Sequence, residues 1–247
     1  MMKLRSVFGS ALISAIFAAA TADAQPDSPP ALIATSPVPR DGTYLAGDRV
    51  SFVLDHLGEQ VRLRFLPSDE VFYLTSEAAP LGARVLKYDT GTEALRVTGW
   101  GGVTLYTPDD PAGIPAEYSD VVHNVDPPPV PARDVKAFAA GLAREVSAHT
   151  DFTVGFAADW EELAQSDAIR ALTCAALRNV GYALEQAAGG PKRNAIADRL
   201  HVVQVIEGNR VNATVHRGVL TVTIDPKLGP SARPSSLVIT RTLVSSF

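Results

Sequence analysis

The spacing of apolar residues changes in the middle of this chain, and a proline-rich stretch separates the two patterns. Between residues 50 and 107 apolar and polar residues alternate, as in the run from Val61 to Phe65. This alternation is typical of strands with one buried face. From Val135 onward apolar residues recur at helical spacing on one face, which is typical of an amphipathic helix. Because the strands come first and the helices follow, the pattern predicts an α+β fold.

The alternating half predicts an antiparallel β meander that closes as a small barrel or packs as a sandwich. Short strand-like runs recur about every ten residues, which is the spacing of such folds. The segment from Asp89 to Thr92 is typical of a hairpin turn, and it lies between strand-like runs at 84–88 and 94–98. Barrel and sandwich remain equally open from this pattern.

The second half predicts helices combined with a β-hairpin. Asp134 is suited to cap a helix over 135–146, and Asp159 with Glu162 resembles a capping box at the start of a longer helix. That helix runs to Ala187 and stops at the Gly-Gly-Pro sequence of 189–191. The remaining expected elements are a helical turn at 194–200, strands at 202–206, 213–215 and 220–224, and a tail at 230–247 that docks or frays.

Two proline-rich stretches divide the chain, one at residues 25–40 and one at 108–131. Neither contains a clear helical or strand pattern, and long stretches of this kind are linkers or functional loops. The predicted division is a signal peptide at 1–24, a proline-rich leader at 25–43, a β-rich domain at 44–107, a linker at 108–132 and an α+β domain at 133–247.

The N-terminus has the three parts of a secretory signal peptide. Lys3 and Arg5 precede an apolar run from Val7 to Ala20, and Ala22-Asp23-Ala24 forms a cleavage site before Gln25. The apolar run is shorter than the about 20 residues that cross a bilayer. We therefore expect a periplasmic or secreted protein with no transmembrane segment after cleavage, the alternative being an uncleaved membrane anchor.

The net charge indicates which partners are excluded, and the cysteine content indicates what stabilises the fold. The formal net charge is −5 and no basic run is present, which argues against a nucleic-acid surface. Cys174 is the single cysteine, so an internal disulfide is excluded and a hydrophobic core must stabilise the fold. Its Ala- and Leu-rich surroundings favour a small buried side chain over a catalytic thiolate.

The common signatures of catalysis are absent from the sequence, including G-x-S-x-G, H-E-x-x-H and the P-loop. No two histidines have the spacing of metal ligands, so we predict neither a metal site nor a cofactor. Two histidines lie near an acid, His123 near Asp126 and His149 near Asp151. The adjacent acids are better explained by solvation than by catalysis, and they are the pairs at 69–70, 109–110 and 161–162.

The most unusual local feature is the sequence Gly99-Trp100-Gly101-Gly102. An aromatic ring on such a turn can serve as a platform for a flat ligand, and Tyr106, Tyr118 and His123 are candidates to extend that surface. The structural interpretation, which we favour, is a hairpin corner or bulge with the indole packed beneath it.

Several segments resemble a family of exported alphaproteobacterial proteins of unknown function and about the length of this chain. They are the segments 88–91, 95–98 and 101–106, together with 218–223 and Arg233-Pro234-Ser235-Ser236 near the end. The resemblance implies a bacterial periplasmic or secreted protein, and it implies no activity and no functional residue.

These observations favour a non-catalytic periplasmic binding or interaction module that recognises an envelope ligand or protein. The alternative is a cell-envelope hydrolase with an unrecognised active site, in which His123 or His149 acts with its neighbouring aspartate. A third hypothesis is a structural subunit of an envelope assembly, in which the proline-rich leader is a spacer.

Overall fold

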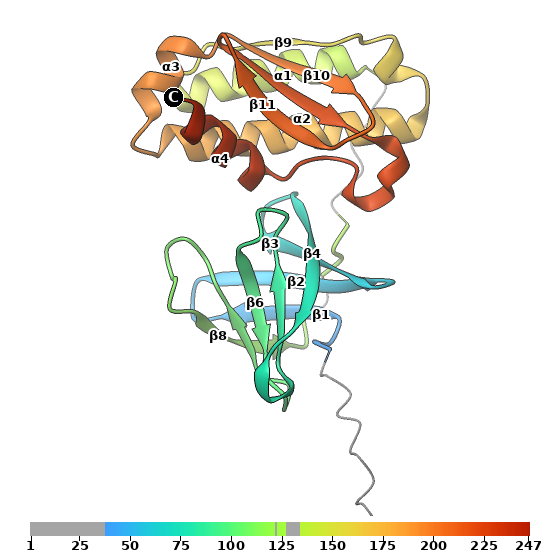
Figure 1. Cartoon of the computed structure of the whole chain (residues 1–247), viewed down its shortest axis with the longest axis vertical. Coiled ribbons are helices and arrows are strands. Elements are labelled where there is room, and N and C mark those ends of the chain that lie inside the picture. Colours follow the sequence, from blue (N-terminus) through green and yellow to red (C-terminus); the bar gives the residue numbers. More distant parts are fainter. Residues whose placement is uncertain (1–37, 122, 127–133) are drawn as a thin grey trace, which may run out of the picture. The chain divides into compact units, whose positions relative to one another are not determined.

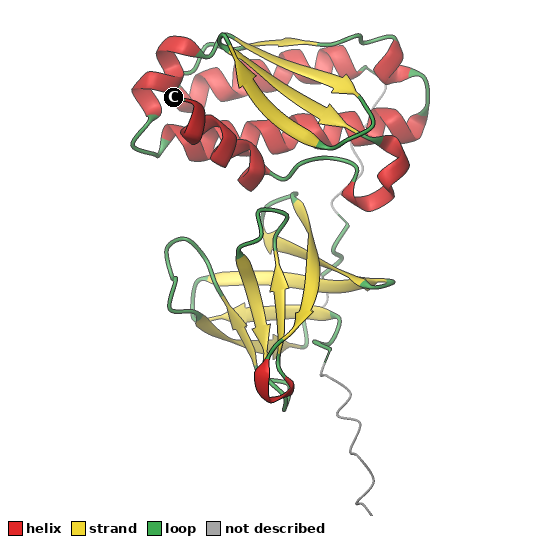
Figure 2. Cartoon of the chain, viewed as in Figure 1, coloured by secondary structure: helices red, strands yellow, loops and turns green. Residues whose placement is uncertain are grey.

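A computed structural model of the chain describes residues 38–121, 123–126 and 134–247 (Figure 1). The predicted signal peptide at 1–24 and most of the predicted leader lie outside these residues. The N-terminal half is all β and the C-terminal half combines helices with a sheet, so the protein has the α+β fold that the sequence predicts (Figure 2).

Strands β1 to β8 form a closed antiparallel barrel, which decides between the two predicted forms of the meander. Each strand pairs with the next, and β8 pairs with β1 through Tyr44 and Tyr118. The inward-facing apolar side chains, such as Phe52, Leu63 and Leu95, are fully buried. The strands are β1 (Gly42–Ala46), β2 (Val50–Leu57), β3 (Gln60–Leu66), β4 (Val71–Ala78), β5 (Arg84–Lys87), β6 (Glu93–Val97), β7 (Val103–Leu105) and β8 (Ile114–Ser119).

Strand β8 corrects the expectation that residues 108–131 contain no element. It pairs with β7 on one side and with β1 on the other, even though Pro115 lies within it. Proline lacks the amide hydrogen and discourages a strand locally. Barrel closure outweighs this local preference, because without β8 both β1 and β7 would leave an unpaired edge.

The C-terminal half packs helices against a sheet with the strand order β11-β12-β10-β9. Strand β10 is parallel to β9 and β12, and β11 forms the expected hairpin with β12. Figure 2 shows helices α1 and α2 on one side of this sheet. The elements are α1 (Val135–Thr150), β9 (Gly155–Ala157), α2 (Asp167–Ala188), α3 (Arg193–Arg199), β10 (Val202–Glu207), β11 (Asn212–His216), β12 (Val219–Ile224) and α4 (Ser236–Ser246).

Helix starts show which capping predictions hold. The carboxylate of Asp134 accepts the Ala137 amide at 2.9 Å and caps α1, as predicted. The expected start of the long helix at Asp159 is wrong, because Asp159 Oδ1 accepts the Glu162 amide at 3.1 Å only at the start of the short 3-10 segment η2 (Glu162–Ala164). Ser166 then adopts an extended conformation, accepts the Ile169 amide at 3.2 Å and starts α2.

The C-terminal tail docks as helix α4. Ser235 is its N-cap, and Ile239 and Leu243 are fully buried in the core shared with α2 and the sheet. The described residues from Val38 onward belong to one compact unit. The domain boundaries inferred from the prolines stay a prediction. None of the helices in the described part of the chain is long and apolar enough to cross a membrane.

Candidate functional site

Trp100 lies on the turn between β6 and β7 with 83% of its surface exposed. The hairpin corner expected for the glycine cluster is confirmed, since the turn joins β6 to β7, but the expectation that the indole packs beneath it is wrong. Thr98 and Gly102 close the turn by backbone hydrogen bonding, and Gly101 has a φ of +91°. Backbone hydrogen bonds therefore stabilise the turn, and the indole ring of Trp100 lies outside it.

The other candidates for the predicted ligand surface have separate neighbours. Tyr106 follows β7 at the end opposite Trp100, and its ring lies 5.9 Å from the Arg96 guanidinium. Tyr118 packs edge-on against Tyr44 at 5.6 Å. The described contacts do not unite the four residues, so their shared ligand surface stays a prediction.

The two histidine–aspartate pairs proposed for hydrolysis have other partners. His123 Nδ1 lies 3.1 Å from the Thr43 hydroxyl, and Asp126 pairs with Arg62. His149 Nδ1 lies 3.9 Å from a Glu185 oxygen. Asp151 in turn pairs with Arg193 at 2.5 Å. The described geometry pairs neither histidine with the aspartate that the hydrolase hypothesis requires, and the Glu185 oxygen lies beyond hydrogen-bond distance of His149.

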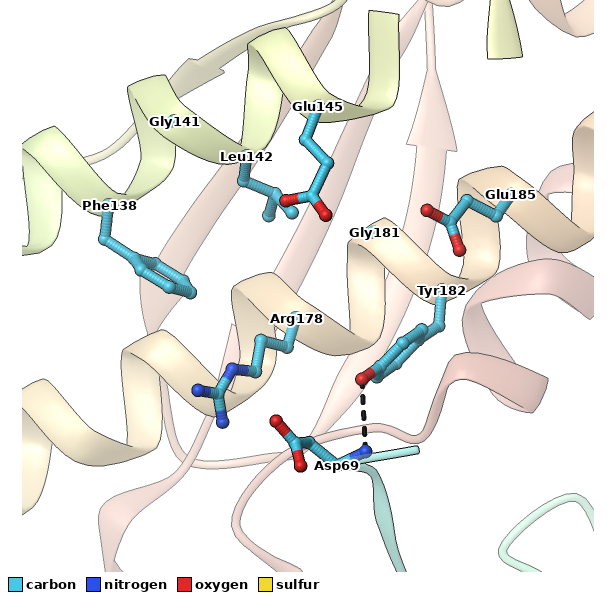
Figure 3. A pocket seen from close by; sticks show the side chains of 9 residues that line it. All are labelled: Asp69, Phe138, Gly141, Leu142, Glu145, Arg178, Gly181, Tyr182 and Glu185. Atoms are coloured by element: carbon cyan, nitrogen blue, oxygen red, sulfur yellow. Dashed lines mark hydrogen bonds between the residues drawn. The ribbon is translucent and has the colours of Figure 1, made fainter. Parts of the chain in front are cut away.

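A groove of about 450 Å³ runs between α1 and α2 (Figure 3). The helices approach closely at Gly181, where an added Cβ would lie 2.9 Å from Leu142 Cδ1. At Gly141 an added Cβ would meet no atom within 4 Å, so the groove is open there. Its lining consists of Asp69, Phe138, Gly141, Leu142, Glu145, Arg178, Gly181, Tyr182 and Glu185.

One part of the groove combines a cation with aromatic rings. The Arg178 guanidinium lies 5.9 Å from the Phe138 ring, within the range of a cation–π contact. Nearby, the Tyr182 hydroxyl accepts the backbone amide of Asp69 at 3.2 Å, and Figure 3 shows the Asp69 carboxylate on the same side as Arg178. Phe138 and Leu142 supply the apolar wall.

The other part of the groove is acidic. Figure 3 shows Glu145 on α1 and Glu185 on α2 on the two sides of the groove, and both side chains are exposed. Together with Asp69 they place three carboxylates around the single guanidinium of Arg178. The groove therefore has a negative potential, which favours a positively charged group in its occupant.

Neither a metal centre nor a reactive thiol is indicated by the described residues, and Cys174 does not line the groove. Across the described ranges, no group of three or more His, Cys, Asp and Glu side chains could hold a metal. Burial raises the pKa of the Cys174 thiol, and the charge of Arg178 opposes this only in part. The buried thiol of Cys174 is therefore held in its protonated form. The prediction that Cys174 is a small buried side chain is confirmed.

A family model described as a domain of unknown function, DUF4908, matches residues 29–243. This chain belongs to the DUF4908 family. Comparison with curated proteins found no match, and comparison with solved structures found none either. The family membership agrees with the predicted resemblance to proteins of unknown function and supplies no activity.

Two segments that carried the resemblance meet in the DUF4908 fold. Asp89, in the β5–β6 turn, accepts the Ser235 hydroxyl at 2.7 Å and its amide at 3.0 Å. Beside it, Glu70 accepts the Ser236 amide at 2.7 Å and its hydroxyl at 2.6 Å. We call these four residues the acid clasp. It ties the barrel to the N-terminus of α4.

The acid clasp corrects the solvation interpretation of the pair at 69–70. Glu70 is only 4% exposed, and burial raises its pKa from 4.5 to about 7 although the Ser236 donors and Arg233 act against the shift. Sequence reasoning missed the groove of this DUF4908 protein as well. The available signal was the repeated spacing of Phe138, Leu142 and Glu145 on one helix and of Arg178, Tyr182 and Glu185 on the next.

Proposed function

We propose that this DUF4908 protein is an exported, non-catalytic binding module whose α1–α2 groove holds a small organic molecule with an amino group. The observation that carries the proposal is the pairing of an apolar wall with an excess of carboxylates in one groove. Small-molecule sites have this composition, apolar for the most part with a few polar groups that fix orientation.

Each part of the groove suits one part of such a ligand. Glu145 and Glu185 would accept hydrogen bonds from an ammonium group, and charge-assisted bonds of this kind are the stronger ones. Phe138 and Leu142 would contact the ligand's carbon skeleton. Arg178 would bind an acidic group if the ligand carries one, since its guanidinium suits carboxylates and phosphates.

Binding is favoured over catalysis because the expected acid–base pairs are separated. His123 bonds to Thr43, and Asp151 pairs with Arg193. The groove residues themselves include no nucleophile beside a base. A hydrolase is therefore not the function that these contacts favour.

Ligand binding in the groove is tested by measuring the thermal stability of the full chain with amine ligands and with a neutral counterpart. Glucosamine, spermidine and a lysine-containing dipeptide are the amine probes, and N-acetylglucosamine is the neutral counterpart of the first. A ligand at a hundredfold excess over its Kd raises stability by about 2.7 kcal/mol. We expect a shift with at least one amine and none with the neutral sugar.

Two double variants tie the shift to the groove. Glu145→Gln with Glu185→Gln should abolish it. Glu161→Gln with Glu207→Gln, exposed acids outside the groove, should leave it unchanged. No shift with any amine, or equal loss in both double variants, would overturn the proposed ligand class.

Export is part of the same proposal and has its own test. The mass and N-terminal sequence of the protein isolated from bacterial cells should be those of a chain that starts at Gln25. A chain that keeps residues 1–24 and sediments with membranes would instead support the uncleaved anchor. Both outcomes are independent of what the groove binds.

A further inference from the structure

A second cavity, of about 90 Å³, lies between strand β4, helix α2 and the connection from β12 to α4. Its polar lining residues are Asp89, Asn179, Ser231, Arg233 and Ser235. Asp89 and Ser235 belong to the acid clasp, whereas Glu70 does not line the cavity. The volume is that of about three water molecules in the liquid, so a molecule that binds here is small.

Arg233 supplies the positive charge of this cavity. Its guanidinium lies 5.7 Å from the centre of the Tyr73 ring, within the range of a cation–π contact. Its Nε is buried and has no hydrogen-bond partner in the part of the chain that the structure describes. A buried donor without an acceptor is costly, so this guanidinium is suited to a ligand that supplies acceptors.

Asp89 supplies the negative charge, and Ser235 uses only part of its hydrogen-bonding capacity. The amide and hydroxyl of Ser235 each bind one carboxylate oxygen, and each oxygen can accept a second hydrogen bond. Although Arg233 and Asp89 line the same cavity, these two described side chains do not form an ion pair with each other. Glu70, the other acid on which the charge of Arg233 acts, directs both oxygens to Ser236. Each charge of the cavity is therefore suited to a ligand group of opposite charge.

Two neutral side chains complete the polar lining. The Ser231 hydroxyl, at the end of η3 (Pro226–Ser231), accepts Gln60 Nε2 at 3.0 Å, which leaves its hydrogen to donate. The Asn179 amide is buried and donates to the Pro234 carbonyl at 2.9 Å. This hydrogen bond fixes the amide and leaves its oxygen as an acceptor. The cavity thus combines a cation and a hydroxyl donor with an anion and an amide acceptor.

We propose that this cavity binds a small α-amino acid in its zwitterionic form. Arg233 and Ser231 bind the carboxylate, and Asp89 and Asn179 bind the ammonium group, through charge-assisted hydrogen bonds. A ligand with a single charge would lie against a like charge in the cavity wall, which is unfavourable. The wall therefore discriminates against a simple anion and against a simple amine.

The size of the cavity restricts the side chain of the amino acid. A volume of about 90 Å³ suits glycine or alanine and is too small for leucine. Val211 and Tyr73 supply apolar contacts for a methyl group. A peptide is disfavoured because its two charged termini lie farther apart than the charges of an amino acid. The inference is independent of the amine ligand proposed for the α1–α2 groove.

The experiment is a thermal-unfolding titration of the full chain with glycine, L-alanine and D-alanine. We expect the unfolding temperature to rise with at least one of them, in proportion to the logarithm of its concentration above Kd. Acetate and methylamine carry the two charges singly, and glycylglycine separates them. We expect no such rise with these three compounds or with leucine.

Three variants assign the shift to the cavity. Arg233→Gln should weaken binding at least about tenfold, since it removes the charge-assisted hydrogen bonds to the carboxylate. Arg96→Gln is the matched control and should leave binding unchanged, since the Arg96 guanidinium also lies near a tyrosine ring, at 5.9 Å, but outside the cavity. Val211→Met narrows the cavity without altering either charge. It should also weaken binding, so the test does not depend on the folding of Arg233→Gln alone.

The outcomes separate this cavity from the α1–α2 groove and from a solvent effect. Equal shifts in the parent and in Arg233→Gln would be those of an excluded osmolyte and would overturn the inference. The absence of a shift with all three amino acids would also overturn it. A shift that is lost in the double variant Glu145→Gln with Glu185→Gln but kept in Arg233→Gln would assign the amino acid to the groove. That result would support the proposed function and overturn this inference.

Discussion

The two ends of the barrel treat polar and apolar side chains in opposite ways. At one end the carboxylate of Glu70 is buried, and that of Asp89 is engaged beside it by the serines that open α4. At the other end Leu81 and Trp100 are almost fully exposed. Each end departs from the ordinary distribution, in which charge faces water and large apolar groups do not.

The contrast between the two ends of the barrel indicates where to look for a partner. Buried carboxylates are tolerated when hydrogen-bond donors meet them, and at the acid clasp all four donors, the amides and hydroxyls of Ser235 and Ser236, come from this chain. Leu81 and Trp100 have no corresponding cover within the described residues. A buried charged group that receives hydrogen bonds from the same chain has a structural role. An exposed apolar group that no described residue covers points to an external surface.

The largest expected effect is at the buried end. Glu70→Ala should lower the free energy of unfolding by about 3 kcal/mol, because it leaves the Ser236 amide and hydroxyl without an acceptor in a buried site. Urea denaturation of the full chain measures it. The matched control is Asp69→Ala, the adjacent acid at the edge of the groove, which should change stability by less than about 0.5 kcal/mol. Equal losses in the two variants would contradict the structural role of the acid clasp.

Glu70 should also give the protein a pH-dependent stability. Burial raises its pKa from 4.5 to about 7, so the folded protein binds this proton more tightly than the unfolded chain does. The contribution of Glu70 is therefore most favourable at low pH and declines as pH rises from about 4.5 to about 7. Over the full interval this amounts to about 3 kcal/mol.

Glu70→Gln separates the charge from the hydrogen bonds, since the amide oxygen still accepts from Ser236. The variant should be at least as stable as the parent at about pH 8, and the difference should vanish near pH 5. Denaturation midpoints at the two pH values measure this. If parent and variant have parallel pH profiles, another group causes the dependence.

A smaller effect is expected at the cap of α4. Ser235→Ala should cost about 1–2 kcal/mol, because the Ser235 hydroxyl accepts the Val238 amide and donates to Asp89. Ser166→Ala is the control, since Ser166 caps α2 by its contact with the Ile169 amide alone. The amount by which Ser235→Ala lowers the free energy of unfolding more than Ser166→Ala does measures the hydrogen bond to Asp89. Equal losses would show that the acid clasp is weaker than its geometry indicates.

At the exposed end of the barrel, the expected change in the free energy of unfolding has the opposite sign. Leu81→Gly should raise the free energy of unfolding by a few tenths to about 1 kcal/mol, because glycine adopts a φ of 60° without strain. Leu57→Gly, at an exposed leucine of strand β2, is the control and should destabilise. Thermal unfolding compares them. A destabilising Leu81→Gly would show that the leucine stabilises the barrel after all.

The smallest effect is expected for Trp100→Ser. Because the indole is 83% exposed, its loss should change stability by less than about 0.5 kcal/mol. A loss of several kcal/mol on thermal unfolding would return Trp100 to a structural role and remove the contrast between the two ends.

The local pattern was sufficient wherever a residue's neighbours in sequence are also its neighbours in space. The alternation around Val61, the turn at 89–92 and the cap at Asp134 all predicted their elements correctly. The prediction failed at Pro115 and at Asp159. At Pro115 closure of the barrel outweighed a poor strand former, and at Asp159 a second cap seven residues later was better placed.

The candidate site was less accessible from the sequence than the fold. The groove joins Asp69 of the barrel to Glu145 and Glu185 on two helices, and no local spacing relates these three residues. Trp100 was correctly recognised as unusual, but the sequence could not decide on which side of its turn the ring lies. That choice depends on whether the barrel core has room for the indole.

Hydrophobic periodicity and capping residues were enough to predict the α+β class, the meander and most helix and strand positions, because both act within a few residues. The closure of the meander, the burial of Glu70 against Ser236 and the exposure of Leu81 and Trp100 at one end of the barrel became apparent only in the folded protein. These features depend on contacts between residues far apart in the chain. Such contacts are determined by the packing of the whole fold, and short-range periodicity carries no information about them.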